Sequence, residues 1–304
     1  MGCAMTAAAS FTRLASIVGF AFVVATARAE VVPPLDHVIM VVMENKNPED
    51  VSDASFISGL VRSGATFSDY RAIAHPSQPN YVALWSGGTQ GIDSNRCPAT
   101  SSPLMTPNLG TLSESAGLTW RAYAENLPAA GSDECFADGK RYSRKHAPWT
   151  NFGNIDHRNE RPFAELAADI AAGRLPRLAF VIPNNSNNMH DGSVAQGDDW
   201  LARNLPGMIE AVGPNGIVVL TWDENRSGSE NRILTVVSGP RVKRGFVSDR
   251  PVNHYTMLRT LCDGLALPSP GAAAAERPML DIWVNPSGDP KAEQEPGATR
   301  STGS

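Results

Sequence analysis

Four runs of consecutive apolar residues, rich in valine and isoleucine, constrain the fold of this chain more than any other feature. They occupy residues 37–43, 178–182, 216–221 and 233–237. A strand that is apolar on both faces suits a sheet covered by helices on both sides. Helical patterns fall between and beside these runs, at residues 55–63, 80–85, 163–172, 199–212 and 254–265. This alternation predicts an α/β fold, a three-layer α/β/α sandwich with a mostly parallel central sheet.

The two ends of the chain differ from the middle in composition. A basic residue precedes an apolar run at residues 14–26, and Ala27-Arg28-Ala29 then forms a small-x-small cleavage site. We therefore predict a signal peptide at residues 1–29, whose apolar run is too short to span a bilayer, and a secreted or periplasmic protein. Residues 285–304 are rich in Pro, Gly and charge, which predicts a disordered tail. Residues 30–284 remain as the folded domain.

Net charge and cysteine content limit which partners the protein is expected to bind and which disulfides it is expected to form. The formal net charge is −5 at pH 7 and there is no basic tract, so we expect no nucleic-acid binding. No segment after the signal peptide is long and apolar enough to form a transmembrane helix. Export permits a disulfide, and Cys97 and Cys135, which flank polar, loop-rich sequence, are the expected pair. Cys262 lies in an apolar helical pattern and is expected as a buried free thiol.

The segment at residues 75–81, His-Pro-Ser-Gln-Pro-Asn-Tyr, places a serine at a predicted helix start. Pro79 fits the first turn of a helix, because that position needs no backbone donor. Ser77 would then lie at the helix N-terminus, where free N–H groups and the macrodipole favour an anion. A serine there can attack phosphorus while the phosphate oxygens contact the helix end. The alternative interpretation is an N-cap serine in a proline-fixed turn.

Polar residues follow three of the four predicted strands. Glu44 and Asn45 come after the first strand, Asp223 and Glu224 follow the third, and an Asn-rich turn follows the second. Functional residues of open α/β sheets collect beyond the carboxyl ends of the strands. Each carboxylate alone could be a strand-end cap. Several together repel one another unless a cation or a proton neutralises them, and oxygen ligands suit a hard divalent cation.

The residues that flank each histidine in the sequence indicate whether it belongs to the candidate site or is structural. Three belong to the candidate site, where we expect phosphate binding or leaving-group protonation: His75, His146 and His190. His37 and His157 are expected to be structural. His254 begins a predicted helix, and its cap and site interpretations both stay open. His146 lies within residues 87–152, a loop-rich stretch that we interpret as an excursion over the strand ends.

Five motifs occur in a distinctive order along the chain. They are Glu44-Asn45, the segment at residues 75–81, Met189-His190-Asp191, Thr221-Trp222-Asp223-Glu224 and residues 253–261. Together they resemble the bacterial phosphoesterase family that contains secreted acid phosphatases and non-haemolytic-type phospholipases C, within the alkaline phosphatase superfamily. The resemblance covers residues 35–283, and residues 142–149 are similar to a further segment of those enzymes. It implies an alkaline phosphatase-like sandwich and a phosphoesterase catalytic domain at residues 30–284.

The resemblance also implies roles for individual residues. The implied metal ligands are Glu44, Asn45, Ser77, Asp223 and Glu224, with Ser77 also the nucleophile. The implied phosphate-contacting histidines are His75, His146 and His190, and Asn80 matches an asparagine that binds a phosphate oxygen. Two departures favour one metal ion over two. Asn188 stands where an aspartate is expected, and Arg232 stands where many superfamily members carry a histidine ligand.

These expectations combine into a two-step phosphoryl transfer. A divalent metal ion of unspecified identity activates Ser77 for attack on phosphorus, His190 protonates the leaving alcohol, and water hydrolyses the phosphoserine. The expected substrate is a phosphomonoester, as for an acid phosphatase. The alternative is a phospholipase C acting on lipid phosphodiesters, although the chain shows no strong amphipathic membrane helix. Two rivals are weaker: a binding protein has no need of the nucleophile, and an acyl hydrolase would carry the Gly-x-Ser-x-Gly elbow.

Overall fold

The computed structural model describes residues 1–2, 31–97, 101–228 and 230–284. The expected signal peptide, apart from its first two residues, and the expected tail at residues 285–304 therefore lie outside the described residues. Contacts divide the chain into residues 1–30 and residues 31–304, and the fold is that of the second unit. Across the described ranges, no helix has both the length and the apolar character needed to cross a membrane.

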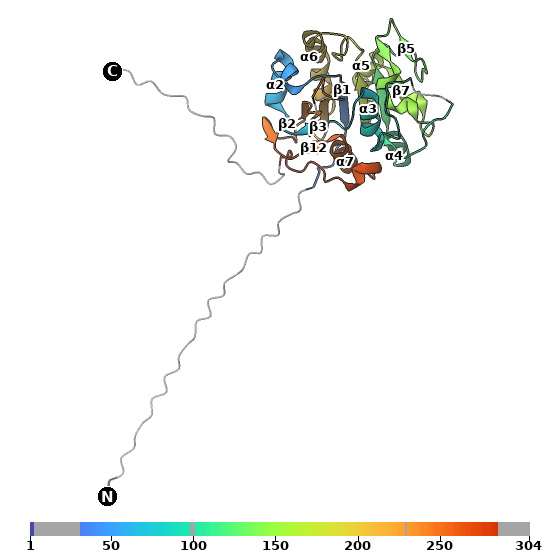
Figure 1. Cartoon of the computed structure of the whole chain (residues 1–304). Helices are drawn as coiled ribbons and strands as arrows, with labels where there is room; N and C mark the ends of the chain where they lie inside the picture. The colour runs from blue at the N-terminus through green and yellow to red at the C-terminus, as the bar shows by residue number, and fades with distance from the viewer. Residues whose placement is uncertain (3–30, 98–100, 229, 285–304) are drawn as a thin grey trace, which may run out of the picture. The chain divides into compact units, whose positions relative to one another are not determined.

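An eight-stranded sheet forms the centre of this unit (Figure 1). Its strands, in spatial order, are β11 (Phe246–Ser248), β2 (Ala65–Phe67), β10 (Thr235–Ser238), β9 (Ile217–Trp222), β1 (Val38–Met43), β8 (Leu178–Ile182), β4 (Trp120–Ala124) and β7 (Glu160–Pro162). Within this sheet β10 alone is antiparallel to its neighbours, β9 and β2. All six residues of β1 are buried, as a strand covered on both faces requires. The predicted α/β fold with a mostly parallel sheet is confirmed.

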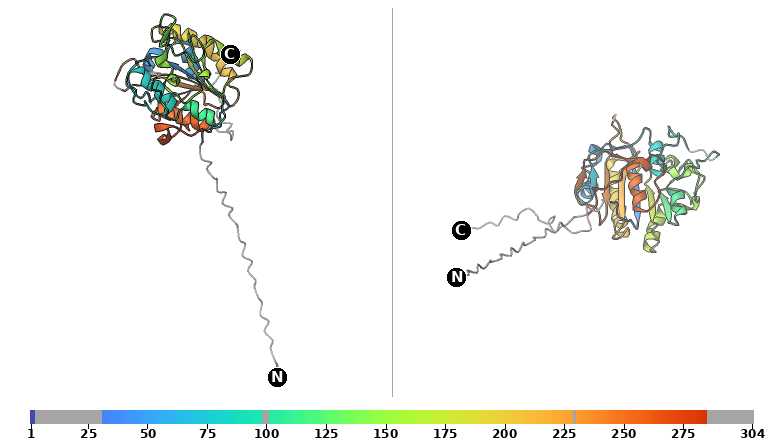
Figure 2. Two further views of the ribbon diagram at one scale, coloured as in Figure 1. Left: turned by 90° about the vertical axis from the view of Figure 1, so that its right-hand side faces the viewer. Right: turned by 90° about the horizontal axis from the view of Figure 1, so that it is seen from below.

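The helices form two groups that cover opposite faces of the sheet (Figures 1 and 2). One group is α2 (Ser55–Ser63), α5 (Ala164–Ala171) and α6 (Val194–Ala211), and the other is α3 (Ser77–Ser86), α4 (Leu109–Ser115) and α7 (His254–Gly264). A right-handed crossover places its helix on a face that depends on which way the chain moves across the sheet. The connections β1 to β2, β7 to β8 and β8 to β9 move in one direction, and β2 to β4 moves in the other. The two helical layers follow from that difference.

Shorter elements connect these parts. They are α1 (Pro48–Val51), the paired strands β3 (Tyr70–Arg71) and β12 (Val252–Asn253), the hairpin of β5 (Phe136–Ala137) and β6 (Tyr142–Ser143), and the 3-10 helices η1 (Arg144–His146), η2 (Pro148–Asn151), η3 (His157–Asn159) and η4 (Gly271–Ala275).

The interpretation of residues 87–152 as an excursion over the strand ends was wrong for part of that stretch. It contains α4 and also β4, which lies inside the sheet between β8 and β7. The sequence of β4 conceals the strand because Arg121 interrupts its apolar residues. Arg121 is tolerated there because its guanidinium forms an ion pair with Asp169 of α5, which packs over this strand. The Arg121 side chain is 31 % exposed and Asp169 is buried, and a buried carboxylate that is paired in this way costs much less than an isolated one.

Helix α3 begins at Ser77, with Pro79 in its first turn, as the sequence predicted, and its N-cap is Pro76 rather than Ser77. All ten of its residues are buried, so the helix lies inside the unit rather than on its surface. It ends at Gly87, which has φ +71° in the left-handed region. A Cβ at Gly87 would lie 2.1 Å from the carbonyl oxygen of Pro270, so both the turn and the close packing there require glycine.

Candidate active site

Two neighbouring strands bring four of the predicted ligands together at one edge of the sheet. β1 and β9 are parallel and paired to their last residues. Glu44-Asn45 and Asp223-Glu224 therefore leave the sheet side by side. The backbone N–H of Asn45 donates to Oδ1 of Asp223 at 3.1 Å. Glu44 and Asp223 are fully buried, and Glu224 is 4 % exposed.

Ser77 faces these carboxylates from the first position of α3. Its Oγ lies 3.2 Å from Oε2 of Glu44 and 3.0 Å from Oε1 of Glu224. A hydroxyl has one hydrogen and can donate to only one of these two oxygens at a time. The other oxygen then needs a proton or a cation between itself and the serine. The nucleophile and the acidic residues predicted from distant parts of the sequence therefore do meet.

The start of α3 offers fewer free N–H groups than the sequence suggested. Pro76 and Pro79 have no N–H, and the N–H of Gln78 donates to Oδ1 of Asn95 at 3.0 Å. The N–H of Ser77 is the remaining donor in the first turn. An anion bound beside Ser77 would depend on side chains more than on the helix end.

Two histidines contact Glu44 and Glu224, each through the carboxylate oxygen that does not face the serine hydroxyl. Nε2 of His146 lies 2.6 Å from Oε1 of Glu44, and both side chains are buried. Nδ1 of His75 lies 2.5 Å from Oε2 of Glu224, and the His75 side chain is 47 % exposed. His146 therefore lies in the buried part of the site, and His75 lies in the part that is exposed to solvent.

His190 lies on the turn that follows β8, and its side chain is 32 % exposed. Its ring centroid is 6.0 Å from that of His146. Nδ1 contacts Oδ1 of Asp191 at 2.6 Å, so Nε2 is the nitrogen available to a substrate. The backbone N–H of Glu44 donates to the carbonyl of Asn188 at 2.9 Å, and Oδ1 of Asn188 accepts from the N–H of His190 at 2.8 Å. These two contacts hold the turn against the end of β1.

Three buried carboxylates in one place perturb each other's ionisation. Burial, with the charges of Glu44 and Glu224, raises the pKa of Asp223 well above its ordinary value. Burial also raises the pKa of Glu224, against the charge of His75. Burial acts in the same sense on Glu44, but the charge and hydrogen bond of His146 bring the pKa of Glu44 below its ordinary value. The site concentrates more negative charge than its two paired histidines neutralise.

The oxygen donors present fit a divalent cation. Among the residues that the structure describes, no three His, Cys, Asp or Glu side chains form a metal-binding cluster by themselves. A cation would therefore need the oxygen of Ser77 as well, which lies within 3.2 Å of two carboxylate oxygens. Oδ2 of Asp223 is buried without a hydrogen-bond partner. A buried carboxylate oxygen of this kind is costly unless a cation or a proton reaches it.

Asn80 organises the loop before the serine. Its Oδ1 accepts from the N–H groups of Ile73 and Ala74, each at 2.9 Å, and its Nδ2 donates to the carbonyl of Ala74 at 2.8 Å. Both the oxygen and the nitrogen of this side-chain amide are thus hydrogen-bonded to backbone groups. A phosphate contact by Asn80, as the resemblance implied, would require these bonds to be released.

His254 supports the backbone of a predicted ligand. Its Nε2 lies 2.7 Å from the carbonyl oxygen of Asp223, and its Nδ1 lies 3.2 Å from the hydroxyl of Tyr70. Asn253, not His254, caps α7, because its side chain accepts from the first-turn N–H groups. Burial lowers the pKa of His254 to about 4. We therefore assign His254 a supporting role behind Asp223.

Two residues of the site were missed in the sequence. The buried hydroxyl of Tyr81 donates to Oε1 of Glu44 at 3.1 Å, and its ring lies 5.2 Å from that of His146. The signal was present, because Tyr81 is four residues after Ser77 and so lies on the same side of the helix. Lys46 donates from Nζ to the carbonyl of Met189 at 2.6 Å, which ties the turn after β8 to the end of β1.

Other candidate residues lie apart from this constellation. The half-exposed side chain of Arg232 faces Glu230, with Nε 3.7 Å from its carboxylate. His37 contacts the carbonyl of Pro176, and His157 contacts Glu160. A hollow of about 720 Å³ between α2 and α6 contains none of the site residues. The disulfide between Cys97 and Cys135 is present, and Cys262 is buried and free.

Solved structures show the same fold. A protein of the alkaline phosphatase superfamily from Vibrio parahaemolyticus aligns with a TM-score of 0.57 over 76 % of this chain and 66 % of that chain, at 12 % identity. Human ectonucleotide pyrophosphatase/phosphodiesterase 5 aligns with a TM-score of 0.53 over 76 % of this chain and 95 % of that chain, at 9 % identity. The fold is that of the alkaline phosphatase superfamily.

Relatives in sequence identify the chemistry. A phosphatidylinositol-3-phosphatase of Mycobacterium tuberculosis is 42 % identical over 84 % of this chain and 85 % of its own length. A probable acid phosphatase of Kluyveromyces lactis is 28 % identical over 86 % of this chain, which spans 66 % of that relative. Fold, site and relatives together define a hydrolase that acts on phosphoric ester bonds. The chain belongs to the phosphoesterase family, whose model matches residues 37–268.

Proposed function

We propose that this protein is a secreted, metal-dependent phosphomonoesterase that works through a phosphoserine at Ser77. The observation that carries the proposal is the position of the Ser77 hydroxyl, 3.2 and 3.0 Å from oxygens of two carboxylates that converge from different strands. A buried serine with only acidic neighbours at this distance has no evident packing role. The same arrangement suits a nucleophile whose proton passes to one of these carboxylates, with a cation between the oxygens to offset the remaining negative charge.

The chain's own residues divide the work of phosphoryl transfer. Ser77 provides the oxygen that attacks phosphorus. His75 and His146, whose rings contact Glu224 and Glu44, would donate hydrogen bonds from their other ring nitrogens to phosphoryl oxygens as charge moves onto those oxygens. His190 is oriented by Asp191 and protonates the leaving alcohol.

The metal ion would be held by oxygen donors from two strands and one helix: Glu44, Asn45, Ser77, Asp223 and Glu224. Bound there, a divalent ion would lower the pKa of the serine hydroxyl and offset the negative charge of the phosphate. Oxygen donors alone do not select one metal, since Mg, Mn, Ca, Fe and Zn all accept them. Elemental analysis of the purified protein identifies the ion, and removal by a chelator should abolish turnover until the ion is returned.

A phosphomonoester is the substrate class that the relatives favour, because the named activities are those of an acid phosphatase and a phosphatidylinositol-3-phosphatase. A phosphomonoester carried on a lipid headgroup is therefore included in the substrate class. The alternative is a phospholipase C, which would cut the phosphodiester of phosphatidylcholine. Release of phosphate from p-nitrophenyl phosphate and from phosphatidylinositol 3-phosphate, against release of phosphocholine from phosphatidylcholine, separates these activities.

The nucleophile is tested by Ser77→Ala with Ser86→Ala as its matched control. Ser86 is a buried serine of the same helix whose hydroxyl donates to the carbonyl of Val82. Ser77→Ala should lose turnover of p-nitrophenyl phosphate while keeping its circular dichroism spectrum, and Ser86→Ala should keep turnover. An acid quench during turnover should trap one phosphoryl group on the peptide that contains Ser77. Wild-type turnover by Ser77→Ala would end the proposal.

Export rests on the signal peptide predicted at residues 1–29. If the prediction holds, protein recovered outside the cytoplasm begins near Glu30, as N-terminal sequencing would show. Retention of the full chain in the cytoplasm would contradict the secreted part of the proposal without affecting the chemistry.

A further inference from the structure

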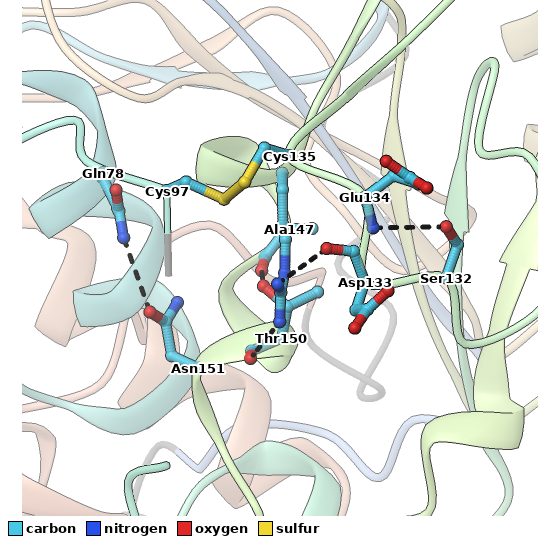
Figure 3. Close-up of a disulfide and its surroundings, with 10 residues drawn as sticks. Gln78, Cys97, Ser132, Asp133, Glu134, Cys135, Ala147, Thr150 and Asn151 are labelled. Atoms are coloured by element: carbon cyan, nitrogen blue, oxygen red, sulfur yellow. Dashed lines mark hydrogen bonds between the residues drawn. A yellow bond between two sulfur atoms is a disulfide. The ribbon is translucent and has the colours of Figure 1, made fainter. Parts of the chain in front are cut away.

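The disulfide links the loop that follows α3 to the segment that precedes β5, and Figure 3 shows the bond and its surroundings. Cys97 lies in the loop that follows α3, the helix whose first residue is Ser77. Cys135 immediately precedes β5, the first strand of the small hairpin that leads to η1 and His146. The two cysteines are 38 residues apart in sequence. The covalent bond therefore connects the surroundings of the nucleophile to the segment that carries a buried histidine of the site.

On the side of α3, the loop is tied to the residue next to the nucleophile. Oδ1 of Asn95 accepts from the backbone N–H of Gln78 at 3.0 Å. The side-chain amide of Gln78 satisfies its hydrogen bonds best with its nitrogen donating to the carbonyls of Arg96 and Ser94 at 2.7 and 3.2 Å. Cys97 is thus linked to the start of α3 through Asn95 and Gln78.

On the side of the hairpin, Cys135 is tied to the residue that begins η1. Its carbonyl accepts from the backbone N–H of Arg144 at 3.0 Å. The buried guanidinium of Arg144 donates to the carbonyls of Asp133 and Thr150, at 2.8 and 3.2 Å. These bonds fix both flanks of η1, whose last residue is His146.

The hairpin is also held at its turn, where the carbonyls of Lys140 and Arg141 accept from Asn185 at 2.9 and 2.8 Å. β5 and β6 form a two-stranded sheet of their own, with two residue pairs and no bond to the central sheet. Phe136 in β5 is exposed, so this strand adds little apolar burial. A two-stranded hairpin of this size is marginally stable by itself. Tyr142 of β6 is buried, so it is the β5 end of the hairpin, beside Cys135, whose position depends on the disulfide and on polar links.

We propose that the Cys97–Cys135 disulfide positions His146 for the reaction. It locks the hairpin to the loop after α3, which keeps Nε2 of His146 at 2.6 Å from Oε1 of Glu44. The inference rests on the proposed function, because it assumes that His146 contributes to turnover. Arg144 acts in the same way, as a positioning residue that does not touch the reacting atoms. Displacements of about 1 Å at a site residue can cost about a hundredfold in rate.

The test compares four proteins: the wild type, Cys97→Ala/Cys135→Ala, His146→Gln, and the protein with all three substitutions. We expect loss of the disulfide to lower kcat on p-nitrophenyl phosphate by about tenfold or more, with a smaller change in KM. In the His146→Gln background the same loss should change kcat by less than about twofold. Groups that act through one another are non-additive in this way, whereas independent effects multiply.

Stability has to be separated from positioning. Ile57→Ala is the matched control, because Ile57 is buried in α2 on the opposite face of the sheet and its truncation destabilises the fold without touching the site. All assays run well below the unfolding midpoint of each protein. If Ile57→Ala loses as much kcat as the disulfide variant, the inference is overturned.

Two further outcomes distinguish the possible failures. Equal loss of kcat on removing the disulfide, with and without His146, would overturn the inference and leave the proposed function intact. Wild-type kcat in His146→Gln would overturn the role of His146 in the proposed function and the inference with it. If the disulfide variant does not fold, Arg144→Lys replaces it in the same cycle, because a single ammonium nitrogen does not reproduce the planar fork whose two nitrogens bond the two carbonyls. The same non-additive result is expected, and multiplicative effects would again refute the inference.

Discussion

Removing one oxygen atom, by Tyr81→Phe, tests the geometry of the site most directly. The Tyr81 hydroxyl donates to Oε1 of Glu44 at 3.1 Å and is fully buried. Burial, with the charges of Glu44 and Asp223, raises the pKa of Tyr81 well above its ordinary value, so the hydroxyl stays protonated and can only donate to this carboxylate. Phenylalanine keeps the ring, its volume and its contact with His146.

The magnitude follows from the kind of hydrogen bond that is lost. A hydrogen bond to a charged group contributes about 1.5–3 kcal/mol to stability. For a domain of this size, we expect the unfolding midpoint to fall by about 3–12 °C. If the bond also orients Glu44 in the transition state, the same energy corresponds to a loss of about 10- to 150-fold in kcat/KM.

Two other tyrosines provide matched controls. The hydroxyl of Tyr123 donates to Asp169 at 2.8 Å, between a strand and a helix away from the site. Tyr123→Phe should therefore lower the melting temperature and leave kcat/KM unchanged. The hydroxyl of Tyr142 is buried without a partner, so Tyr142→Phe should be neutral or slightly stabilising.

The assay is thermal unfolding by circular dichroism, together with initial rates on p-nitrophenyl phosphate for all three variants. The reasoning predicts that Tyr81→Phe alone loses both stability and activity. A Tyr81→Phe protein with wild-type melting temperature and wild-type kcat/KM would refute it. Equal losses of activity in Tyr81→Phe and Tyr123→Phe would show that general destabilisation, rather than the bond to Glu44, controls the rate.

Three further predictions concern stability. Cys97→Ala/Cys135→Ala releases a loop of 38 residues and should reduce the free energy of unfolding by about 4 kcal/mol; a urea titration showing less than about 1 kcal/mol would contradict the loop-closure argument. Asp198 accepts from two N–H groups at the start of α2, so Asp198→Ala should cost about 1–3 kcal/mol and Asp198→Asn, which keeps one acceptor oxygen, about half as much, with kcat unchanged in both. Burial opposes the ionisation of Asp169, but Arg121 holds its pKa below the ordinary value of 3.8. The stabilisation by Asp169 is therefore present above pH 3.8 and lost as the pH falls through the lower folded pKa, so the melting temperatures of wild type and Asp169→Asn should converge in acid and differ at neutral pH.

The pattern of apolar residues was sufficient to predict the central strands. β1, β8 and β9 match their predicted runs closely because each is apolar along its whole length. β4 was missed because a charged residue interrupts it, and the ion pair that makes this tolerable comes from a helix far along the chain. Local composition cannot reveal a partner that only the folded chain supplies.

The candidate site shows the same division. Glu44, Asp223 and Glu224 could be placed at one edge from the strand pattern, and Ser77 from its helix start. The use of Asn80 by the backbone before the serine could not be predicted, because an amide takes whichever donors and acceptors the folded loop presents. Tyr81 was predictable in principle from its spacing, but nothing local shows that it faces a carboxylate.

The sequence by itself determined the α/β architecture and the residue types at the strand ends. Both follow from local sequence, because the spacing of apolar residues indicates strands and helices and each residue type has its own chemistry. Only the tertiary structure decided which of these side chains contact one another. The Ser77 hydroxyl contacts Glu224 across 147 positions of the chain, and His146 contacts Glu44 from η1, which follows a hairpin joined by a disulfide to the loop after α3. Such contacts depend on strand order, crossover direction and packing, so they form only when the whole sheet is assembled.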